Sequence, residues 1–420
     1  MPSASFRLSI WMSASVAAFF LLTLSAPSGY SLGATLLLLG GLAATWRYRC
    51  AAPAEADVQD RTLIALLLAV FAVNALAVFW HGDSSKYLDQ GSRYLMAIPI
   101  LWGLRYVRLR PDCLWGGLAA GCLGAAGLTW WQMSVLRLPR AEGFVTSAIP
   151  FGDIALAMGF WSLMGTVWMA RQRRFGWAAF MLLGALGGSY TFIASATRGG
   201  LIAIPLLLGL AATALLRRET LKPVLAGVAV LAVGVVVMLA ALPGGKIAED
   251  RYSDAITAWH EYTQQGEVAN NTVGPRLEAW KAALISIPER PLLGWGHPEY
   301  DAHLEELIQA GRVDPFISTL ANTHNQFLEV WLHQGSLGLA ALLALLIASF
   351  WYFAQRLRHA DTAVRILACC GASLPAAFAA FSLTQVILGR NNGVIFFLAS
   401  LTIWWAMMRQ EEAASPTQTE

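Results

Sequence analysis

Residues 62–80, with the sequence TLIALLLAVFAVNALAVFW, decide the fold of this chain. The stretch contains no charged side chain. A helix needs about 20 consecutive apolar residues to cross the hydrocarbon core of a bilayer, where its backbone groups can bond only to one another. This segment therefore predicts a membrane-spanning helix.

Comparable apolar runs, separated by short charged or Gly/Pro-containing breaks, fill most of the 420-residue chain. Hydrophobic residues make up 57% and charged residues 13%, about half the charged share of a typical soluble domain. The fold class is therefore all-α, a polytopic integral membrane protein. We predict about twelve spans, at residues 8–25, 30–46, 62–80, 92–107, 113–134, 152–170, 175–194, 199–216, 223–242, 325–353, 366–387 and 393–408.

The Lys and Arg residues orient these spans. Of the 29, 17 fall in one alternate set of connections, six in the opposite short loops and six in one long loop. Because cytoplasmic loops are enriched in Lys and Arg, we predict both termini in the cytoplasm and the long loop outside. The net charge of +3 gives no reason to expect a nucleic-acid partner. The expected partners are instead membrane lipids and lipid-linked molecules.

The predicted organisation has four parts. Residues 1–242 hold the first nine spans, 243–323 the long outside loop, 324–408 the last three spans and 409–420 a polar cytoplasmic tail. The loop is too long for a passive connection, and two or three amphipathic helices can be recognised in it. One begins near Pro275, and another runs from about 301 to 310.

Polar residues at the end of this loop are candidates for chemistry. Thr323-His324-Asn325-Gln326 fits a capping box, with His324 in the first helical position. The positive potential there would keep this imidazole neutral and able to accept a proton. An interfacial histidine that only caps the helix is the alternative. Glu329 and His333 lie one turn apart in the same span, where a structural hydrogen bond and a functional role are both open.

Outside arginines form the second candidate group. Arg198 lies in Ser195-Ala-Thr-Arg-Gly-Gly200, Arg276 starts a loop helix, and Arg140, Arg93 and Arg390 lie at other outside helix ends. Each alone could anchor to lipid phosphates, but together they would suit a pyrophosphate, which guanidinium groups bind through paired hydrogen bonds. No Asp-x-Asp pair is present to hold Mg²⁺ or Mn²⁺, so we expect metal-independent chemistry without a cofactor.

These motifs resemble the shared core of O-antigen ligases and polymerases. The resemblance rests on three fragments in order: residues 195–200, then Arg276-Leu-Glu-Ala-Trp280 with Pro291-Leu-Leu-Gly-Trp-Gly296, then His324-Asn-Gln-Phe-Leu-Glu329 with Gly335-Ser-Leu-Gly-Leu339. It covers residues 185–345 by motif and the whole chain by topology. The family implies a lipid-linked-sugar glycosyltransferase architecture of the GT-C-like type.

The resemblance also implies an activity. An O-antigen ligase transfers polysaccharide from undecaprenyl pyrophosphate to a lipid A–core sugar, on the periplasmic side of the bacterial inner membrane. Arg198 and Arg276 match arginines held to bind the donor pyrophosphate, and His324 matches the histidine held to activate the acceptor hydroxyl. Arg140 and Arg93 are added donor-binding candidates, and Asn325 and Glu329 are supporting residues.

Three alternatives remain open at this point. An O-antigen polymerase or a protein O-oligosaccharyltransferase would use the same donor with another acceptor. The single large outside loop and the lack of a C-terminal soluble part favour the ligase. A lipid-linked sugar transporter is the alternative of another class, but transporters commonly show repeated halves, and we find no internal repeat.

Overall fold

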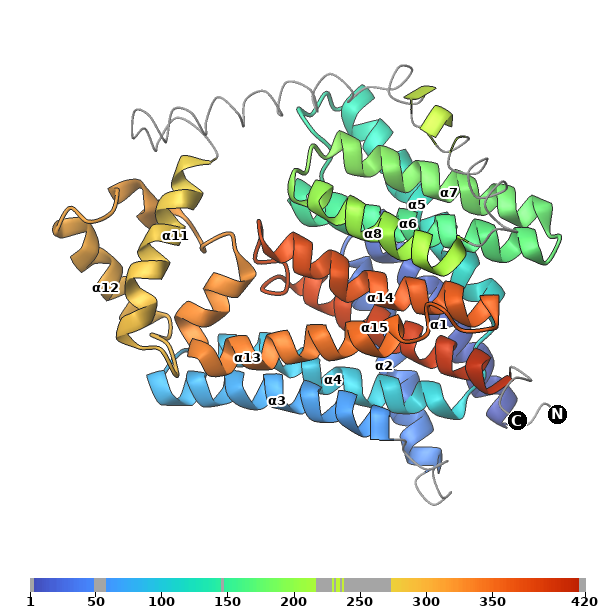
Figure 1. Ribbon diagram of the computed structural model, residues 1–420, viewed down its shortest axis with the longest axis horizontal. Coiled ribbons are helices and arrows are strands. Elements are labelled where there is room, and N and C mark those ends of the chain that lie inside the picture. The colour runs from blue at the N-terminus through green and yellow to red at the C-terminus, as the bar shows by residue number, and fades with distance from the viewer. Residues whose placement is uncertain are drawn as a thin grey trace.

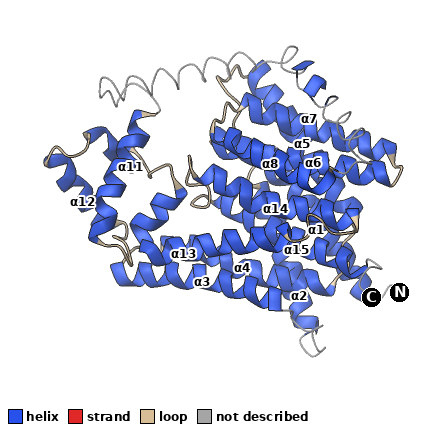
Figure 2. Ribbon diagram, viewed as in Figure 1, coloured by secondary structure: helices blue, strands red, loops and turns tan. Residues whose placement is uncertain are grey.

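A computed structural model describes residues 4–48, 58–144, 147–216 and 273–414, together with a few residues between 229 and 237. Within these ranges the chain forms helices and connecting loops, without a strand (Figure 2). The α-helices are α1 (Ala4–Ser25), α2 (Gly29–Tyr48), α3 (Val58–His81), α4 (Lys86–Tyr106), α5 (Pro111–Ser134), α6 (Ala148–Arg171), α7 (Phe175–Ala194), α8 (Gly199–Leu215), α11 (Gly274–Ser286), α12 (Pro298–Gln309), α13 (Gln326–Ala354), α14 (Thr362–Ser382) and α15 (Asn391–Ala414). Two short 3₁₀-helices, η1 (Ile287–Glu289) and η2 (Pro315–Thr319), follow α11 and α12.

Eleven of the expected spans coincide with these helices, and the remaining one, 223–242, lies largely outside the described residues. Within the described ranges, nine helices are long and apolar enough to cross a membrane. The helix α8 is apolar but only 17 residues long. The helix α4 has sufficient length but begins earlier than expected, so that Lys86, Asp89 and Arg93 all lie in its first turns. The described part of the chain is thus all-helical, and its long apolar helices are those of a multi-pass membrane protein.

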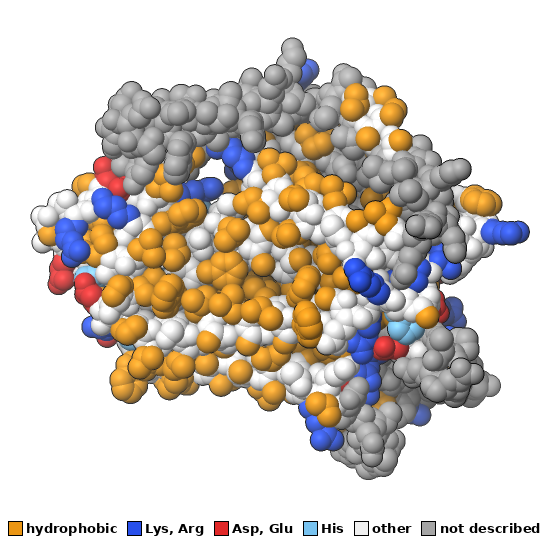
Figure 3. All heavy atoms as spheres, viewed as in Figure 1, with side chains coloured by type: hydrophobic (Ala, Val, Ile, Leu, Met, Phe, Trp, Pro, Cys, Tyr) orange, Lys and Arg blue, Asp and Glu red, His pale blue; other side chains and the backbone are white. Residues whose placement is uncertain are grey.

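The long helices pack side by side into one bundle, with α11 and α12 at one end (Figure 1). The start of α1 and the end of α15 lie at the opposite end of the bundle. Apolar side chains cover the middle of the visible face, whereas charged side chains gather towards its two ends (Figure 3). Large side chains such as Phe79, Ile347 and Trp351 are more than 60% exposed on the helix surfaces. This distribution suits a bundle whose middle faces hydrocarbon.

The sequence predicts one continuous span at residues 325–353, but α13 is interrupted. Part of the loop between α11 and α12 forms backbone hydrogen bonds with α13 at the interruption. At Gly335, φ is 65° and ψ is −168°, so the helix is interrupted there. The backbone N–H groups of Trp295 and Gly296 donate to the carbonyls of Leu332 and His333, while Ser336 N–H donates to the Pro291 carbonyl. The interruption therefore leaves these backbone groups paired, as burial requires.

The last helix also differs from expectation. Instead of ending at 408, α15 continues to Ala414, because its last turns contact neighbouring connections. The Gln410 side chain donates to the carbonyls of Leu104 and Val107, and the Arg356 guanidinium pairs with Glu412 at 2.9 Å. The first residues of the expected polar tail are therefore helical, since tertiary bonds hold them against the bundle.

Candidate functional site

The predicted capping box at the start of α13 is wrong. The residue that caps this helix is Asn325, whose side-chain oxygen accepts from the N–H groups of Phe327 and Leu328. His324 therefore lies before the cap and not in the first helical turn. Its φ is 53°, a left-handed conformation that costs a residue with a Cβ about 1–2 kcal/mol. Strain of this kind persists where surrounding contacts enforce it, and it is common at functional sites.

The contacts that hold this turn come from both sides of His324. Glu329 accepts hydrogen bonds from the Thr323 N–H at 2.9 Å and the Thr323 hydroxyl at 2.8 Å. The His324 N–H donates to the Asn322 side chain, and the Trp280 indole of α11 donates to the Thr323 carbonyl. The two expected supporting residues, Asn325 and Glu329, thus fold the turn that presents the histidine.

A residue that sequence analysis missed orients the imidazole. His324 Nδ1 lies 3.0 Å from Oε1 of Gln385, an oxygen that can only accept, so Nδ1 carries the proton and Nε2 keeps its lone pair. Gln385 was expected inside the span 366–387, but α14 ends at Ser382 and the glutamine lies in the connection that follows. The adjacent polar pair Thr384-Gln385 at the end of an apolar run was the available signal.

Several elements distant in sequence converge on this turn. Gln326 accepts from the N–H groups of Leu388 and Gly389, which joins α13 to the connection before α15. A Cβ on Gly199 would lie 2.0 Å from the Thr384 hydroxyl, so the start of α8 can approach the end of α14 only without a side chain there. The glycine beside Arg198 thus permits close packing of these two helices.

Three of the four predicted donor-binding arginines gather beside α11. Burial of Arg276, followed by the charges of Arg198 and Arg140, lowers the pKa of its guanidinium. The loop carrying Arg140 is joined to the end of α7 by a hydrogen bond from Ala141 N–H to the Ala194 carbonyl, close to Arg198. Arg140 also lies 3.8 Å from Glu142. In Figure 3, Lys or Arg side chains border an opening between α11 and the bundle. Positive charges that act on one another in this way favour the binding of an anion between them.

The same positive region acts on His324. Burial and the charges of Arg276 and Arg390 lower its pKa, while the Gln385 hydrogen bond and Glu329 act in the opposite direction. The imidazole is therefore neutral at physiological pH, as the sequence predicted, but for another reason. Desolvation and arginine charges replace the helix-end potential that we had assumed.

Arg93 lies two turns into α4 and pairs with Asp89 at 2.9 Å on the same helix. Together with Ser31 and Thr35 of α2 it lines the polar part of a groove between α2, α4 and α15. No contact connects Arg93 with Arg276 or His324 in the described part of the chain, so the structure does not bring it into the arginine cluster.

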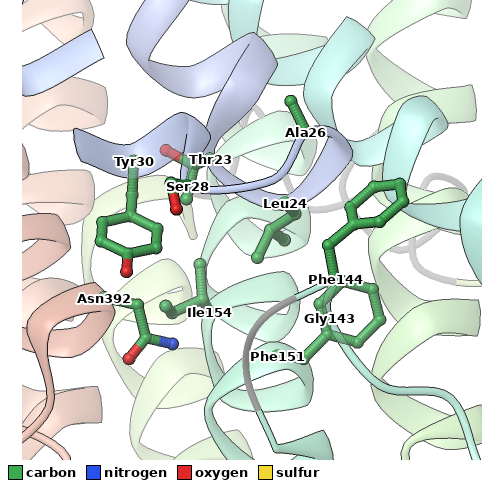
Figure 4. Close-up of a pocket in the computed structure, with 10 residues that line it drawn as sticks. All are labelled: Thr23, Leu24, Ala26, Ser28, Tyr30, Gly143, Phe144, Phe151, Ile154 and Asn392. Carbon is green, nitrogen blue, oxygen red and sulfur yellow. The ribbon is translucent and has the colours of Figure 1, made fainter. Parts of the chain in front are cut away.

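A small cavity lies nearby, between α1, α6 and the start of α15. Tyr30 and Asn392 face it with Thr23 and Phe151 (Figure 4). Its volume of about 20 Å³ has room for little more than a water molecule. Across residues 4–48, 58–144, 147–216 and 273–414, no three His, Cys, Asp or Glu side chains gather so that they could hold a metal ion.

Comparison with known proteins gives two findings. Residues 183–343 match the family model described as "O-Antigen ligase", which confirms the resemblance seen in the motifs. This range contains Arg198, Arg276, His324 and Glu329. A Haemophilus influenzae protein, described only as uncharacterized, is 23% identical over 388 residues, which span 92% of this chain and 95% of that protein. At a coarse level, the family match supports an enzyme of the O-antigen ligase and polymerase type.

Proposed function

From the O-antigen ligase match over residues 183–343, we propose that this protein transfers a glycan from undecaprenyl pyrophosphate to a sugar hydroxyl of lipid A–core. The reaction would take place on the periplasmic face of the bacterial inner membrane. One observation carries the proposal: a neutral, oriented histidine lies beside a cluster of arginines at one end of a membrane bundle.

In this proposal, Arg276, Arg198 and Arg140 hold the donor pyrophosphate. Their mutual repulsion is relieved when an anion binds, and guanidinium groups retain their charge when partly buried. During transfer the bond between the anomeric carbon and the phosphate oxygen breaks, and negative charge grows on the leaving pyrophosphate. Positive groups already fixed at that position stabilise this charge in the transition state.

His324 would act as the general base. Its Nε2 takes the proton of the acceptor hydroxyl as the oxygen attacks the anomeric carbon, with inversion of configuration. The hydrogen bond from Nδ1 to Gln385 keeps the lone pair on Nε2 and holds the ring in place. The left-handed backbone of His324 turns the chain at that residue, before α13 begins.

The direct test is transfer in vitro with purified protein, lipid-linked glycan and rough lipopolysaccharide. His324→Ala should abolish transfer while expression and melting temperature stay near those of the wild type, because general-base catalysis contributes about 10²–10⁴-fold. His324→Gln is a matched control, since it retains a hydrogen-bonding side chain without a basic nitrogen. Near-normal transfer by the alanine variant would remove His324 as the base.

Gene deletion separates the family's activities. Loss of all O-antigen from lipopolysaccharide would indicate a ligase, and a core that carries one repeat would indicate a polymerase. Unchanged lipopolysaccharide would point to protein glycosylation. Flipping of a labelled lipid-linked sugar in proteoliposomes without glycan transfer would instead support the transporter alternative.

A further inference from the structure

A second pocket lies between α11, α12, η2 and the start of α13. Its volume is about 210 Å³, compared with about 20 Å³ for the cavity of Figure 4. Aromatic and polar side chains line it, chiefly those of Tyr87, His297, Tyr300, Asn322, Glu329 and His333. The pocket is therefore large enough for more than water, and its lining mixes flat rings with hydrogen-bonding groups.

The rings form one continuous aromatic wall. Tyr87 stacks on His297 with centroids 3.5 Å apart, and His297 stacks on His333 at 4.1 Å. Tyr300 meets His333 edge-on at 5.5 Å. His297 Nδ1 lies 2.9 Å from a carboxylate oxygen of Asp83, and His333 Nδ1 donates to the Gly296 carbonyl at 2.7 Å. These bonds fix both imidazoles, so the wall is formed before any ligand arrives.

The acidic side chains Asp301 and Glu329 line the pocket, whereas Lys86 lies outside the lining, with its Nζ 4.8 Å from the centroid of the Tyr87 ring. Burial and the neighbouring His333 lower the pKa of His297 to about 4, although Asp83 acts against this. Glu329 and Asp301 supply carboxylates, and Asn322 supplies an amide. The lining contains no Lys or Arg, in contrast to the arginine cluster. An uncharged polar ligand with an apolar face therefore fits this pocket better than a phosphate does.

A pyranose ring has this chemistry, because its C–H groups form an apolar face and its hydroxyls bond to carboxylates and amides. The pocket is also next to the proposed base. Asn322 and Thr323, which line it, directly precede His324, and the His324 N–H donates to the Asn322 side chain. A sugar bound here would thus contact the two residues that directly precede the proposed base in the chain.

We propose that this pocket is a sugar-binding subsite that holds a ring of the acceptor glycan beside His324. The inference rests on the proposed glycan transfer. A ring of the donor glycan offers the same chemistry, so the test must distinguish the two sources.

The test fills the pocket without removing any polar contact. Ala321 lines it and is exposed, so Ala321→Phe should occupy the space meant for the sugar. The matched control is Ala302→Phe, an equally exposed alanine on α12 that is not part of the lining. We expect Ala321→Phe to raise the KM for rough lipopolysaccharide by about tenfold or more, with kcat and the donor KM near wild type. The Ala302→Phe variant should behave as the wild type.

Each outcome decides something. If only the donor KM rises, the pocket is a sugar subsite for the donor glycan. Unchanged KM values for both substrates, or a change in kcat alone, would overturn the proposal. If Ala321→Phe does not fold, the variant Asp301→Asn replaces it. Asp301 is exposed, and this substitution exchanges one carboxylate oxygen for an amide nitrogen. The same rise in the KM for rough lipopolysaccharide is expected.

A binding measurement without turnover separates this inference from the proposed function. Titration calorimetry with lipid-free core oligosaccharide should detect binding to the wild type and weaker binding to Ala321→Phe. If the wild type performs no transfer in the assay, the proposed function fails, whatever the calorimetry shows. If the wild type transfers and the pocket variants equal it in both KM values and oligosaccharide binding, only the pocket inference fails.

Discussion

The hydrogen bond between Gln385 and His324 offers a sharp test of the site, because it orients the imidazole of the proposed base without touching the arginine cluster. Gln385 is 1% exposed, and its Oε1 is the acceptor for the Nδ1 proton of the imidazole at 3.0 Å. Gln385→Met retains the length and approximate volume of the side chain but removes the acceptor. The Nδ1–H group of a half-buried ring then lacks its partner.

The expected size of the effect follows from this geometry. A buried donor without an acceptor costs about 1–3 kcal/mol, and the imidazole can escape part of that cost by moving its proton to Nε2 or by rotating. Either change removes the lone pair from the acceptor hydroxyl. Loss of about 1–3 kcal/mol of transition-state stabilisation corresponds to a decrease in kcat of roughly 5- to 150-fold. The KM for the donor should stay unchanged, because Gln385 lies outside the arginine cluster.

The assay is in vitro transfer at saturating substrates, measured across pH. Gln385→Glu serves as the conservative control because its carboxylate still accepts from Nδ1. It should retain most of the activity at alkaline pH. The new negative charge raises the pKa of His324, so the fall in rate on acidification should begin at higher pH. If Gln385→Met shows the wild-type kcat and the wild-type pH profile, Gln385 does not position the base.

Further predictions concern the charges and the backbone around the same site. Arg276→Ala or Arg198→Ala should lower kcat/KM for the donor by about 10- to 150-fold, which is the range expected when hydrogen bonds to a charged group are lost. The decrease in kcat/KM for the acceptor should be smaller. Normal turnover at low donor concentration would refute the phosphate role. Because neutral His324 is the active form and its pKa is lowered, wild-type activity should persist to pH values below the usual histidine range and disappear as pH falls through that pKa. Arg390→Gln removes one charge that lowers this pKa, so the loss should move to higher pH, and an unmoved pH profile would contradict the assignment. Gly335→Ala places a Cβ 2.1 Å from the Leu292 carbonyl oxygen, at a residue whose φ is 65°. The backbone conformation alone costs about 1–2 kcal/mol, so the melting temperature in detergent should fall. An unchanged melting temperature would show that the interruption of α13 is easily remodelled.

The sequence by itself determined the membrane helices, because the apolar runs that form them are local and must satisfy their backbone bonds within each segment. It also identified His324, Arg198 and Arg276 as candidates, since unusual polar residues at the ends of apolar spans are visible without a fold. The match to the O-antigen ligase model over residues 183–343 agrees with those motifs.

Only the tertiary structure decided which of these residues meet. It brought Arg140 to Arg276 and left Arg93 paired with Asp89, although both arginines had looked alike in sequence. It placed Asn325, and not Thr323, at the helix cap, and it joined Gln385 to His324 across 61 positions of the chain. Such contacts depend on how helices pack and where loops are inserted, as at the break in α13, and no local pattern of hydrophobicity or charge encodes them.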